Sequence, residues 1–372
     1  MLNKRLYCIL LSAVMLLMTP LYASVPSLPE EEEGGVDIKE IAFSHILDSY
    51  SFHITQIGDK VISVPLPVIV KSKERGWFIF SSARFHHGHA SYEGFSIAEK
   101  GEAYAYKIVE TLSDGTTIRP IDLSITKAVF SMILTVLLLC WFFISIARKY
   151  AKNPRKAPSG MQGLIEPVIL FVLEDTIRAS LGDAYKKYAP YLLTVFFFIL
   201  ALNIGGMIPL FPFGANVTGN VVIPMVLALL SFIIICASST SHYWREILWP
   251  PTVPMWLKFP LPIMPLIELI SLLVKPTVLM LRLFANMMAG HLIVLVFLSL
   301  IFVLGALGAA VSGGVALVAV LITVFVTAIH LLIAFIQAYV FTLLSAIFIN
   351  MARVKEEHHA VETVKSEQII DN

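Results

Sequence analysis

The segment AVFSMILTVLLLCWFFISIA, residues 128–147, contains twenty residues and not one Asp, Glu, Lys or Arg. About 20 apolar residues in a helix are enough to cross the hydrocarbon of a bilayer, which is about 30 Å thick. The segment therefore predicts a transmembrane helix. The whole chain agrees, because 57% of its 372 residues are hydrophobic and only 14% are charged, against about 25% charged in soluble proteins. This composition argues against a soluble globular protein.

A cluster of basic residues directly follows this span. It consists of Arg148, Lys149, Lys152, Arg155 and Lys156, and Arg178, Lys186 and Lys187 come later in the same segment. Short loops that are rich in Lys and Arg lie on the cytoplasmic side of a membrane. We therefore expect the residues before the span to be outside the cytoplasm and the basic loop to be inside.

Residues 1–23 have the three-part form of a secretory signal peptide. Lys4 and Arg5 precede an apolar run, and the run ends at Pro20-Leu21-Tyr22-Ala23. We expect cleavage after Ala23, with an uncleaved membrane anchor as the alternative. A secretory leader also places the segment that follows it outside the cytoplasm, in agreement with the basic loop.

Four more spans follow from the remaining apolar segments. Residues 188–244 contain no Asp, Glu, Lys or Arg and are interrupted by a short external turn rich in Pro, Gly and Asn, which predicts helices over 190–211 and 221–237. A proline-rich connection, expected to be cytoplasmic, comes next. After Arg282 no ionised group occurs before residue 353, which predicts two long helices that turn near Ser312. The predicted fold is an α-helical polytopic membrane protein with about five transmembrane helices, the last two forming a long tilted hairpin.

The segment between the leader and the first span differs in kind. Alternating and β-branched residues occur at 61–64 and 77–80, with turn signals at 58–59 and 113–115. We predict a β-rich extracytoplasmic domain at the N-terminus. The domain organisation is then a signal peptide (1–23), a β-rich domain (24–126), a transmembrane region (127–352) and a cytoplasmic tail (353–372).

Three histidines in this domain, His86, His87 and His89, could bind a metal ion. No Cys or carboxylate stands at a supporting spacing beside them, so we expect an exposed surface loop and no metal. The three cysteines lie far apart in apolar runs and predict neither a disulfide nor a metal site. No cofactor is expected, and a net charge of +1 gives no reason to expect a nucleic-acid partner.

Four polar side chains share one face of the fourth predicted span. Counted from Glu268, Lys275 is seven residues further on, Arg282 fourteen and Asn286 eighteen. At about 100° per residue they form a stripe about 40° wide. An ionised side chain inside a bilayer costs at least about 2.5 kcal/mol, so each charge needs an explanation. For Lys275, beside Pro276, we favour a structural or interfacial role. For Glu268, structural pairing and the wall of a hydrated path are equal alternatives.

Arg282 is the charge that is hardest to explain by local structure. The residues around it, 278–285, contain no carboxylate that could pair with it. A guanidinium stays protonated at every accessible pH, so it is a fixed cation and not a proton carrier. A fixed cation in lipid suits an anion that moves past it.

The last predicted helix carries neutral polar groups on one stripe. Thr323, His330 and Gln337 succeed one another at intervals of seven residues. His330 could relay protons near neutral pH or form an interhelical hydrogen bond. His291 is 21 residues before Ser312 and His330 is 18 after it, so a turn at that point would bring both imidazoles to a similar depth. His291 lies about 180° around its helix from Arg282.

At these residues the sequence resembles subunit a of the F-type ATP synthase, the membrane stator that carries protons past the rotating c-ring. The resemblance rests on LRLFANMMAGH at 281–291 and AFIQAYVFT at 334–342. It covers roughly residues 125–350 and includes Asn203 and the segment 209–212.

The resemblance implies roles for particular residues. Arg282 resembles the essential stator arginine, and Asn286 and Gln337 resemble its polar neighbours. Glu268 resembles a carboxylate that lines the cytoplasmic half-channel.

His291 and His330 match the two positions that line the external half-channel. Members of the family commonly have a carboxylate at one of these positions and a histidine at the other. Here both positions are histidine, so the residue that takes up the proton is not fixed by the resemblance.

The implied function is that of a proton-translocating stator subunit, with two offset half-channels and a fixed arginine facing the c-ring carboxylates. Such a subunit is not catalytic alone. The implied partners are the c-ring, the b-type peripheral stalk subunits, the remaining ATP synthase subunits and lipid. The implied location is a bacterial inner membrane, with a periplasmic N-terminal domain and a cytoplasmic C-terminus. An ion-coupled secondary transporter is the alternative, and it should show paired repeats, which we do not find in the sequence.

Overall fold

The computed structural model describes residues 48–57, 60–88, 90–98, 104–112, 114–152, 157–208, 212–248, 263–305 and 309–353. The predicted signal peptide, the proline-rich connection at 249–262 and the tail after Arg353 lie outside the described residues. The chain divides into two units, Met1–Ile38 and Lys39–Asn372. All the described elements belong to the second unit.

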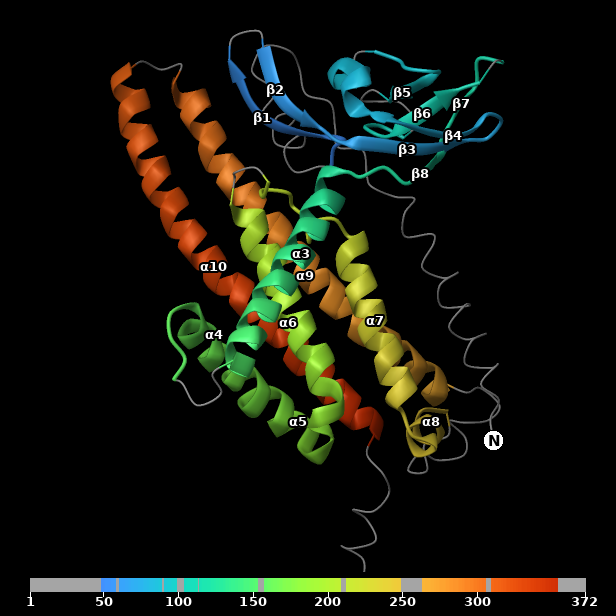
Figure 1. Ribbon diagram of the computed structural model, residues 1–372, viewed down its shortest axis with the longest axis vertical. Coiled ribbons are helices and arrows are strands. Elements are labelled where there is room, and N and C mark those ends of the chain that lie inside the picture. The colour runs from blue at the N-terminus through green and yellow to red at the C-terminus, as the bar shows by residue number, and fades with distance from the viewer. Residues whose placement is uncertain are drawn as a thin grey trace, which may run out of the picture. The chain divides into compact units, whose positions relative to one another are not determined.

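Short antiparallel strands form the N-terminal part of the described chain (Figure 1). The strands are β1 (Ser51–Ile57), β2 (Lys60–Pro65), β3 (Pro67–Ser72), β4 (Gly76–Ser81), β5 (Phe95–Ile97), β6 (Ile108–Thr111), β7 (Thr117–Ile118) and β8 (Ile121–Asp122). They pair as β1-β2, β4-β3-β8 and β5-β6-β7. The prediction of a β-rich region is confirmed, and its two turn signals fall in the β1-β2 and β6-β7 connections.

The hairpin of β3 and β4 shows how local sequence builds this region. The Ser72 hydroxyl oxygen accepts hydrogen bonds from the backbone N–H groups of Glu74 and Arg75, at 3.2 and 3.0 Å. Gly76 closes the turn with φ +88°, a conformation that glycine adopts without steric cost. Within the strands, inward and outward side chains alternate.

The inward side chains form the core of the β-rich region. Val68 and Val70 are fully buried and pack with Phe85 and Phe95. The ring of Phe78 meets that of Phe95 edge to face at 5.3 Å between centroids. Burial and a hydrogen bond to the Asp122 carboxylate raise the pKa of Tyr50, which stays a protonated donor at the edge of this core.

One carboxylate is buried within the same region. Glu110 on β6 is 1% exposed and accepts hydrogen bonds from the Ser72 hydroxyl at 2.5 Å and the Lys73 N–H at 3.4 Å. The Arg75 guanidinium lies 3.3 Å from it and covers the rings of Phe78 and Phe95. This network connects the β3-β4 turn to the neighbouring sheet.

The histidine segment is a short 3₁₀ helix, η2 (Ser82–Gly88), and not the predicted loop. It contains His86 and His87, and His86 is exposed. His89 lies outside the described residues. Within the described parts of the chain, no group of His, Cys, Asp or Glu side chains is arranged to hold a metal ion.

Helices form the rest of the described chain. They are α3 (Lys127–Lys152), α4 (Met161–Leu170), the π-helical η3 (Phe171–Arg178), α5 (Ala179–Leu181), the 3₁₀ turn η4 (Gly182–Ala184), α6 (Tyr185–Met207), α7 (Val222–Ser238), α8 (Ser241–Leu248), α9 (Ile263–Gly305) and α10 (Ala309–Arg353). Figure 1 shows α9 and α10 as the long orange and red helices that pack against each other.

Four of these helical segments are long and apolar enough to span a membrane, and a fifth span results if the bent pair of α7 and α8 is counted as one. The four are Lys127–Lys152, Met161–Met207, Leu266–Phe297 and Ala316–Arg353. The bend between α7 and α8 is 106°. The sequence predicted about five transmembrane helices, and the described residues contain four candidate spans, or five if the bent pair is counted.

Two details differ from the sequence prediction. The final hairpin does not turn near Ser312, because α9 ends at Gly305 and α10, which contains Ser312, begins at Ala309. An apolar helix in lipid keeps its backbone hydrogen bonds internal, so Gly313 and Gly314 do not end it. The predicted cytoplasmic loop is also largely helical from Met161 onward, because its apolar side chains, Val172 and Ile177 among them, are fully buried in the helix core.

The Glu110 network generates a prediction about stability. Glu110→Ala should destabilise the β-rich region by about 2–4 kcal/mol, because the buried Ser72 hydroxyl, the Lys73 N–H and the Arg75 cation lose their acceptor. Hydrogen exchange of the purified chain, followed by mass spectrometry on peptides from β3, β4 and β6, measures the local opening free energy.

The matched control is Glu93→Ala. Glu93 lies 4.0 Å from Arg75 with 52% of its side chain exposed, so its removal should change exchange little. Equal exchange rates in the two variants would contradict the structural role of Glu110.

Candidate functional site

A hydrogen bond between two membrane helices marks the centre of the polar stripe. Asn286 on α9 donates its side-chain N–H to the Gln337 carbonyl oxygen on α10, at 2.6 Å. Gln337 is 4% exposed. The sequence placed these two amides on separate stripes, and the fold joins them.

Arg282 lies one helical turn before Asn286 and is exposed. Within the described parts of the chain, it forms no ion pair with a carboxylate. Helix α9 continues through Pro276 without a break, so the predicted stripe keeps its helical register. A permanent cation is thus presented on an apolar surface, without a carboxylate partner among the described residues.

The two other charges of the stripe have different surroundings. The Lys275 ammonium lies 5.4 Å from the centroid of the Phe348 ring on α10, a packing contact in which the ring stabilises the cation. Glu268 is half-buried and lies near enough to Tyr243 of α8 to interact with it electrostatically. Lys275 therefore contributes to helix packing, whereas Glu268 lies by the short helix that follows α7.

The imidazole of His330 packs directly on the backbone of α9. A Cβ atom built on Gly290 would come within 2.3 Å of His330 Nε2, so only glycine leaves room for the ring. The other ring nitrogen, Nδ1, lies 3.2 Å from the carbonyl oxygen of Val326. Because Gly290 precedes His291 in the chain, the two histidines lie at adjacent levels of the α9-α10 hairpin.

His291 faces a third helix. A Cβ atom on Gly206 of α6 would lie 3.9 Å from His291 Nε2. This nitrogen is buried and has no hydrogen-bond partner. Two titratable groups lie close enough to act on the His291 ring electrostatically: Lys127 at the start of α3 and His330 on α10.

The segment between α6 and α7, which the sequence predicts to be an external turn, contributes further polar groups. Asn216 is 6% exposed and Thr218 is fully buried. The Thr218 hydroxyl donates to the Asn203 carbonyl oxygen at 2.9 Å, and the Asn216 N–H donates to the Met288 sulfur at 3.3 Å. The described part of the turn, residues 212–221, is therefore packed against the helices.

Asn216 has a carbonyl oxygen, Oδ1, that is buried without a hydrogen-bond partner, like His291 Nε2. Asn216 contacts Met288, three residues before His291 on α9. Two unsatisfied polar atoms thus line one side of α9. Sequence reasoning gave Asn216 and Thr218 no role. Their position as amide and hydroxyl groups within a long segment that has no charged residue was the signal that could have identified them.

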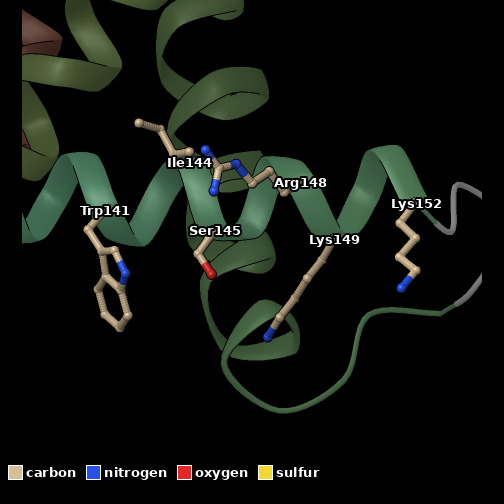
Figure 2. A pocket seen from close by; sticks show the side chains of 6 residues that line it. All are labelled: Trp141, Ile144, Ser145, Arg148, Lys149 and Lys152. Carbon is tan, nitrogen blue, oxygen red and sulfur yellow. The ribbon is translucent and has the colours of Figure 1, made fainter.

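The C-terminal end of α3 carries a basic groove (Figure 2). Its lining is made by one helix and consists of Trp141, Ile144, Ser145, Arg148, Lys149 and Lys152. Figure 2 shows the Trp141, Ser145 and Lys149 side chains on the same side of the helix. Arg155 and Lys156 lie outside the described residues. An aromatic ring followed by cations at a helix end is typical of a membrane-water boundary.

Comparison with known proteins separates the chain into two parts. Residues 129–350 match the family described as ATP synthase A chain. Residues 41–123 match a family described as a domain of unknown function, DUF8433. The boundary between the two matches coincides with the start of α3.

Curated relatives named ATP synthase subunit a align over most of the chain. The protein of Pelodictyon phaeoclathratiforme is 34% identical over 274 residues, which are 72% of this chain and 75% of the relative. That of Chlorobium phaeobacteroides is 35% identical over 243 residues, 64% of this chain and 67% of the relative. That of Myxococcus xanthus is 38% identical over 247 residues, 64% and 76% of the two chains.

The first family match covers more than half of the chain and contains all the residues of the polar stripe and both membrane histidines. The chain therefore belongs to the ATP synthase subunit a family, whose members are non-catalytic membrane subunits of the ATP synthase complex.

Proposed function

We propose that this subunit guides protons through two offset half-channels to c-ring carboxylates that face Arg282. The family and the membrane helices make it a multi-pass inner-membrane protein with a role in proton translocation. The observation that carries the proposal is an exposed, permanently charged Arg282 beside the Asn286–Gln337 hydrogen bond. Membership of the ATP synthase subunit a family argues against the alternative function, that of an ion-coupled secondary transporter.

The charge on Arg282 gives the site its chemistry. A carboxylate in hydrocarbon is strongly disfavoured in its ionised form, so a ring carboxylate is protonated while it faces lipid. Opposite Arg282 the ionised form is stabilised, and the proton leaves. The guanidinium itself stays protonated. It therefore keeps protons from passing directly between the half-channels and makes them travel with the ring.

The groups around His291 and His330 support an external half-channel. His291 Nε2 and Asn216 Oδ1 are buried without partners, and His330 packs on Gly290 next to His291. A buried polar group without a partner is costly unless water or an exchanging proton satisfies it. In this proposal protons arrive by way of these groups and reach the ring on the α9 side.

Glu268 supports the cytoplasmic half-channel. It is half-buried, on the same stripe as Arg282 and two turns before Lys275. An ionisable carboxylate at this place gives a released proton an acceptor on the way out. The partners in this proposal are the c-ring and the b-type peripheral stalk, within the complete ATP synthase.

The free energy that one proton releases on crossing the membrane is too small to make one ATP. One charge moved through 100 mV yields about 2.3 kcal/mol, so several protons must act together. A rotating ring adds their contributions, and the stator provides the fixed cation against which the ring turns.

Arg282→Ala tests the proposal directly. We expect loss of ATP-driven proton pumping and of ATP synthesis in a complex that still assembles, because the ring carboxylate loses the cation that stabilises its ionised form. Arg282→Lys should also be severely impaired, since a lysine can deprotonate when desolvated and offers a point charge in place of a planar fork. Coupled proton flux in vesicles with a quantified amount of assembled complex is the measurement.

Lys275→Ala is the matched control, because it removes the other cation of the stripe. Lys275 packs on Phe348, so its loss should lower stability more than coupling. Near-normal ATP synthesis with alanine at position 282 would refute the stator role of Arg282.

Replacement of the histidines tests the external half-channel. Histidine is cationic when protonated and has an ordinary pKa of about 6.5, whereas glutamate is neutral when protonated and has an ordinary pKa of about 4.3. His291→Glu and His330→Glu should therefore each shift the pH profile of proton conduction. His242→Gln, in α8, is the control that should leave the profile in place.

The profile is measured as proton flux against external pH in vesicles that contain the assembled complex. If the profiles of both glutamate variants coincide with that of the native protein, the two histidines are structural hydrogen-bonding groups.

The proposed topology has a periplasmic N-terminal domain and a cytoplasmic C-terminus. It is supported by the basic groove at the end of α3. A cysteine at His86, which is exposed on η2, should react with a membrane-impermeant maleimide added to intact spheroplasts. A cysteine at Lys152 should react only after the membrane is opened. Protection of position 86 in intact spheroplasts would reverse the assignment.

A further inference from the structure

We propose that the outer face of the β4-β3-β8 sheet docks on the phospholipid headgroups of the membrane, next to the point where α3 enters it. This outer sheet face consists of Ile69, Lys71, Trp77, Ile79, Ile121 and Leu123. The proposal requires only that α3 crosses a membrane, and it does not depend on the path of protons.

The strand register places these six side chains together. Ile69 is paired with Ile79, and Lys71 is paired with Trp77 on one side and with Ile121 on the other. The N–H of Leu123 donates to the Ile69 carbonyl at 2.9 Å, which continues the same alternation. Directly paired residues point to the same side of a sheet. The six therefore form one contiguous surface across three strands.

This surface is apolar and uncovered by the described parts of the chain. Ile79 is 74% exposed, Ile121 and Leu123 are each 60% exposed, and Trp77 is 56% exposed. On the opposite side of the sheet, Val68 and Val70 are fully buried under η2 and β5. The sheet thus has two apolar faces, and only one is used by the core. Contiguous exposed apolar surface of this kind marks an interaction site.

The surface is held close to the start of the first membrane span. Leu123 is four residues before Lys127, the first residue of α3, and four residues extend at most about 14 Å. The backbone in between is fixed, because the N–H of Ile125 donates to the Pro67 carbonyl at 3.1 Å and that of Lys127 to the Ser49 carbonyl at 2.8 Å. The first turn of α3 is also capped by Asp48, whose carboxylate accepts from the Ala128 N–H at 3.0 Å.

The lipid-facing side of α3 continues the apolar character. Leu137 is 62% exposed and Trp141 is 70% exposed, and only 17% of the most apolar stretch of this helix is buried in the chain. An apolar sheet face within about 14 Å of such a helix meets the same membrane. This continuity favours lipid over a second polypeptide as the occupant.

The composition of the face fits the headgroup region and not the hydrocarbon. Tryptophan is enriched at the membrane-water interface, where its ring is apolar and its N–H is polar. The Lys71 ammonium lies 5.6 Å from the centroid of the Trp77 ring, at the centre of the face. Its alkyl stem covers apolar surface, while the charge can reach the phosphate of a lipid.

Photo-crosslinking in the assembled ATP synthase tests the proposal. Trp77→p-benzoylphenylalanine, an aromatic replacement, is incorporated into the subunit, and the complex is reconstituted into vesicles of equal parts phosphatidylcholine and phosphatidylglycerol. After illumination, mass spectrometry of the subunit identifies what position 77 touches. We expect adducts with phospholipid. Ile79→p-benzoylphenylalanine examines the same face, so the test does not depend on one substitution.

Two positions of similar exposure serve as references. Trp141→p-benzoylphenylalanine, on the lipid-facing side of α3, should give phospholipid adducts. Tyr104→p-benzoylphenylalanine should give none. Tyr104 is 51% exposed and belongs to the connection between β5 and β6, two strands whose Phe95 and Ile108 pack against the opposite side of the sheet. Adducts from positions 77 and 79 to another polypeptide, or to a second copy of this chain, would overturn the proposal. The absence of adducts at both positions, as expected for Tyr104, would overturn it equally.

A charge variant examines the contribution of the headgroup. Lys71→Glu should lower the yield of phospholipid adducts at position 77 at least about twofold in the vesicles that contain phosphatidylglycerol. In vesicles of phosphatidylcholine alone, the yield should change little. An unchanged yield in the anionic vesicles would refute the part of the proposal that gives Lys71 a headgroup contact.

Discussion

A polar group in hydrocarbon has no water to bind, and this constraint governs the helical region. Backbone groups are satisfied within the helices. Polar side chains are satisfied between elements, as in the bond from Asn286 to Gln337 and the bond from Thr218 to Asn203. Each bond joins segments that are distant in sequence, so the polar residues help to decide which helices pack together. Arg282 differs, since this chain gives it no carboxylate within its described residues, and its charge is available to a partner.

Close approach between helices positions the histidines. Gly290 leaves room for the His330 ring on α9, and Gly206 brings α6 against Met287 and toward His291. Small residues at helix interfaces allow such contacts in membranes. Among the buried side-chain atoms of the described residues that lack a hydrogen-bond partner are His291 Nε2 and Asn216 Oδ1. They lie beside the tightest contacts of the bundle, where an unsatisfied polar atom has a functional explanation in the proposed half-channel.

The β-rich region has apolar side chains on both faces of one sheet, and only one of these faces is covered by the core. Its inner face is closed by Phe85 and Phe95, and the buried Glu110 ties the β3-β4 turn to the neighbouring sheet. Hydrogen bonds from Ile125 and Lys127 hold this region to the beginning of α3. A domain so attached has a fixed relation to the first turn of α3, and so does its outer sheet face.

The sequence alone was enough for the membrane class and for the stripe of Glu268, Arg282 and Asn286, because apolar length and helical spacing are local properties. Its count of about five spans compares with four to five candidate spans in the described residues. Tertiary structure decided three other features. Helix α10 already begins at Ala309, before the turn predicted near Ser312, since glycines near residue 313 are tolerated inside an apolar helix. Residues 161–184 form helices because their apolar side chains are buried against distant ones. Asn216 and Thr218 become part of the site because Met288 and Asn203, far away in sequence, supply their partners.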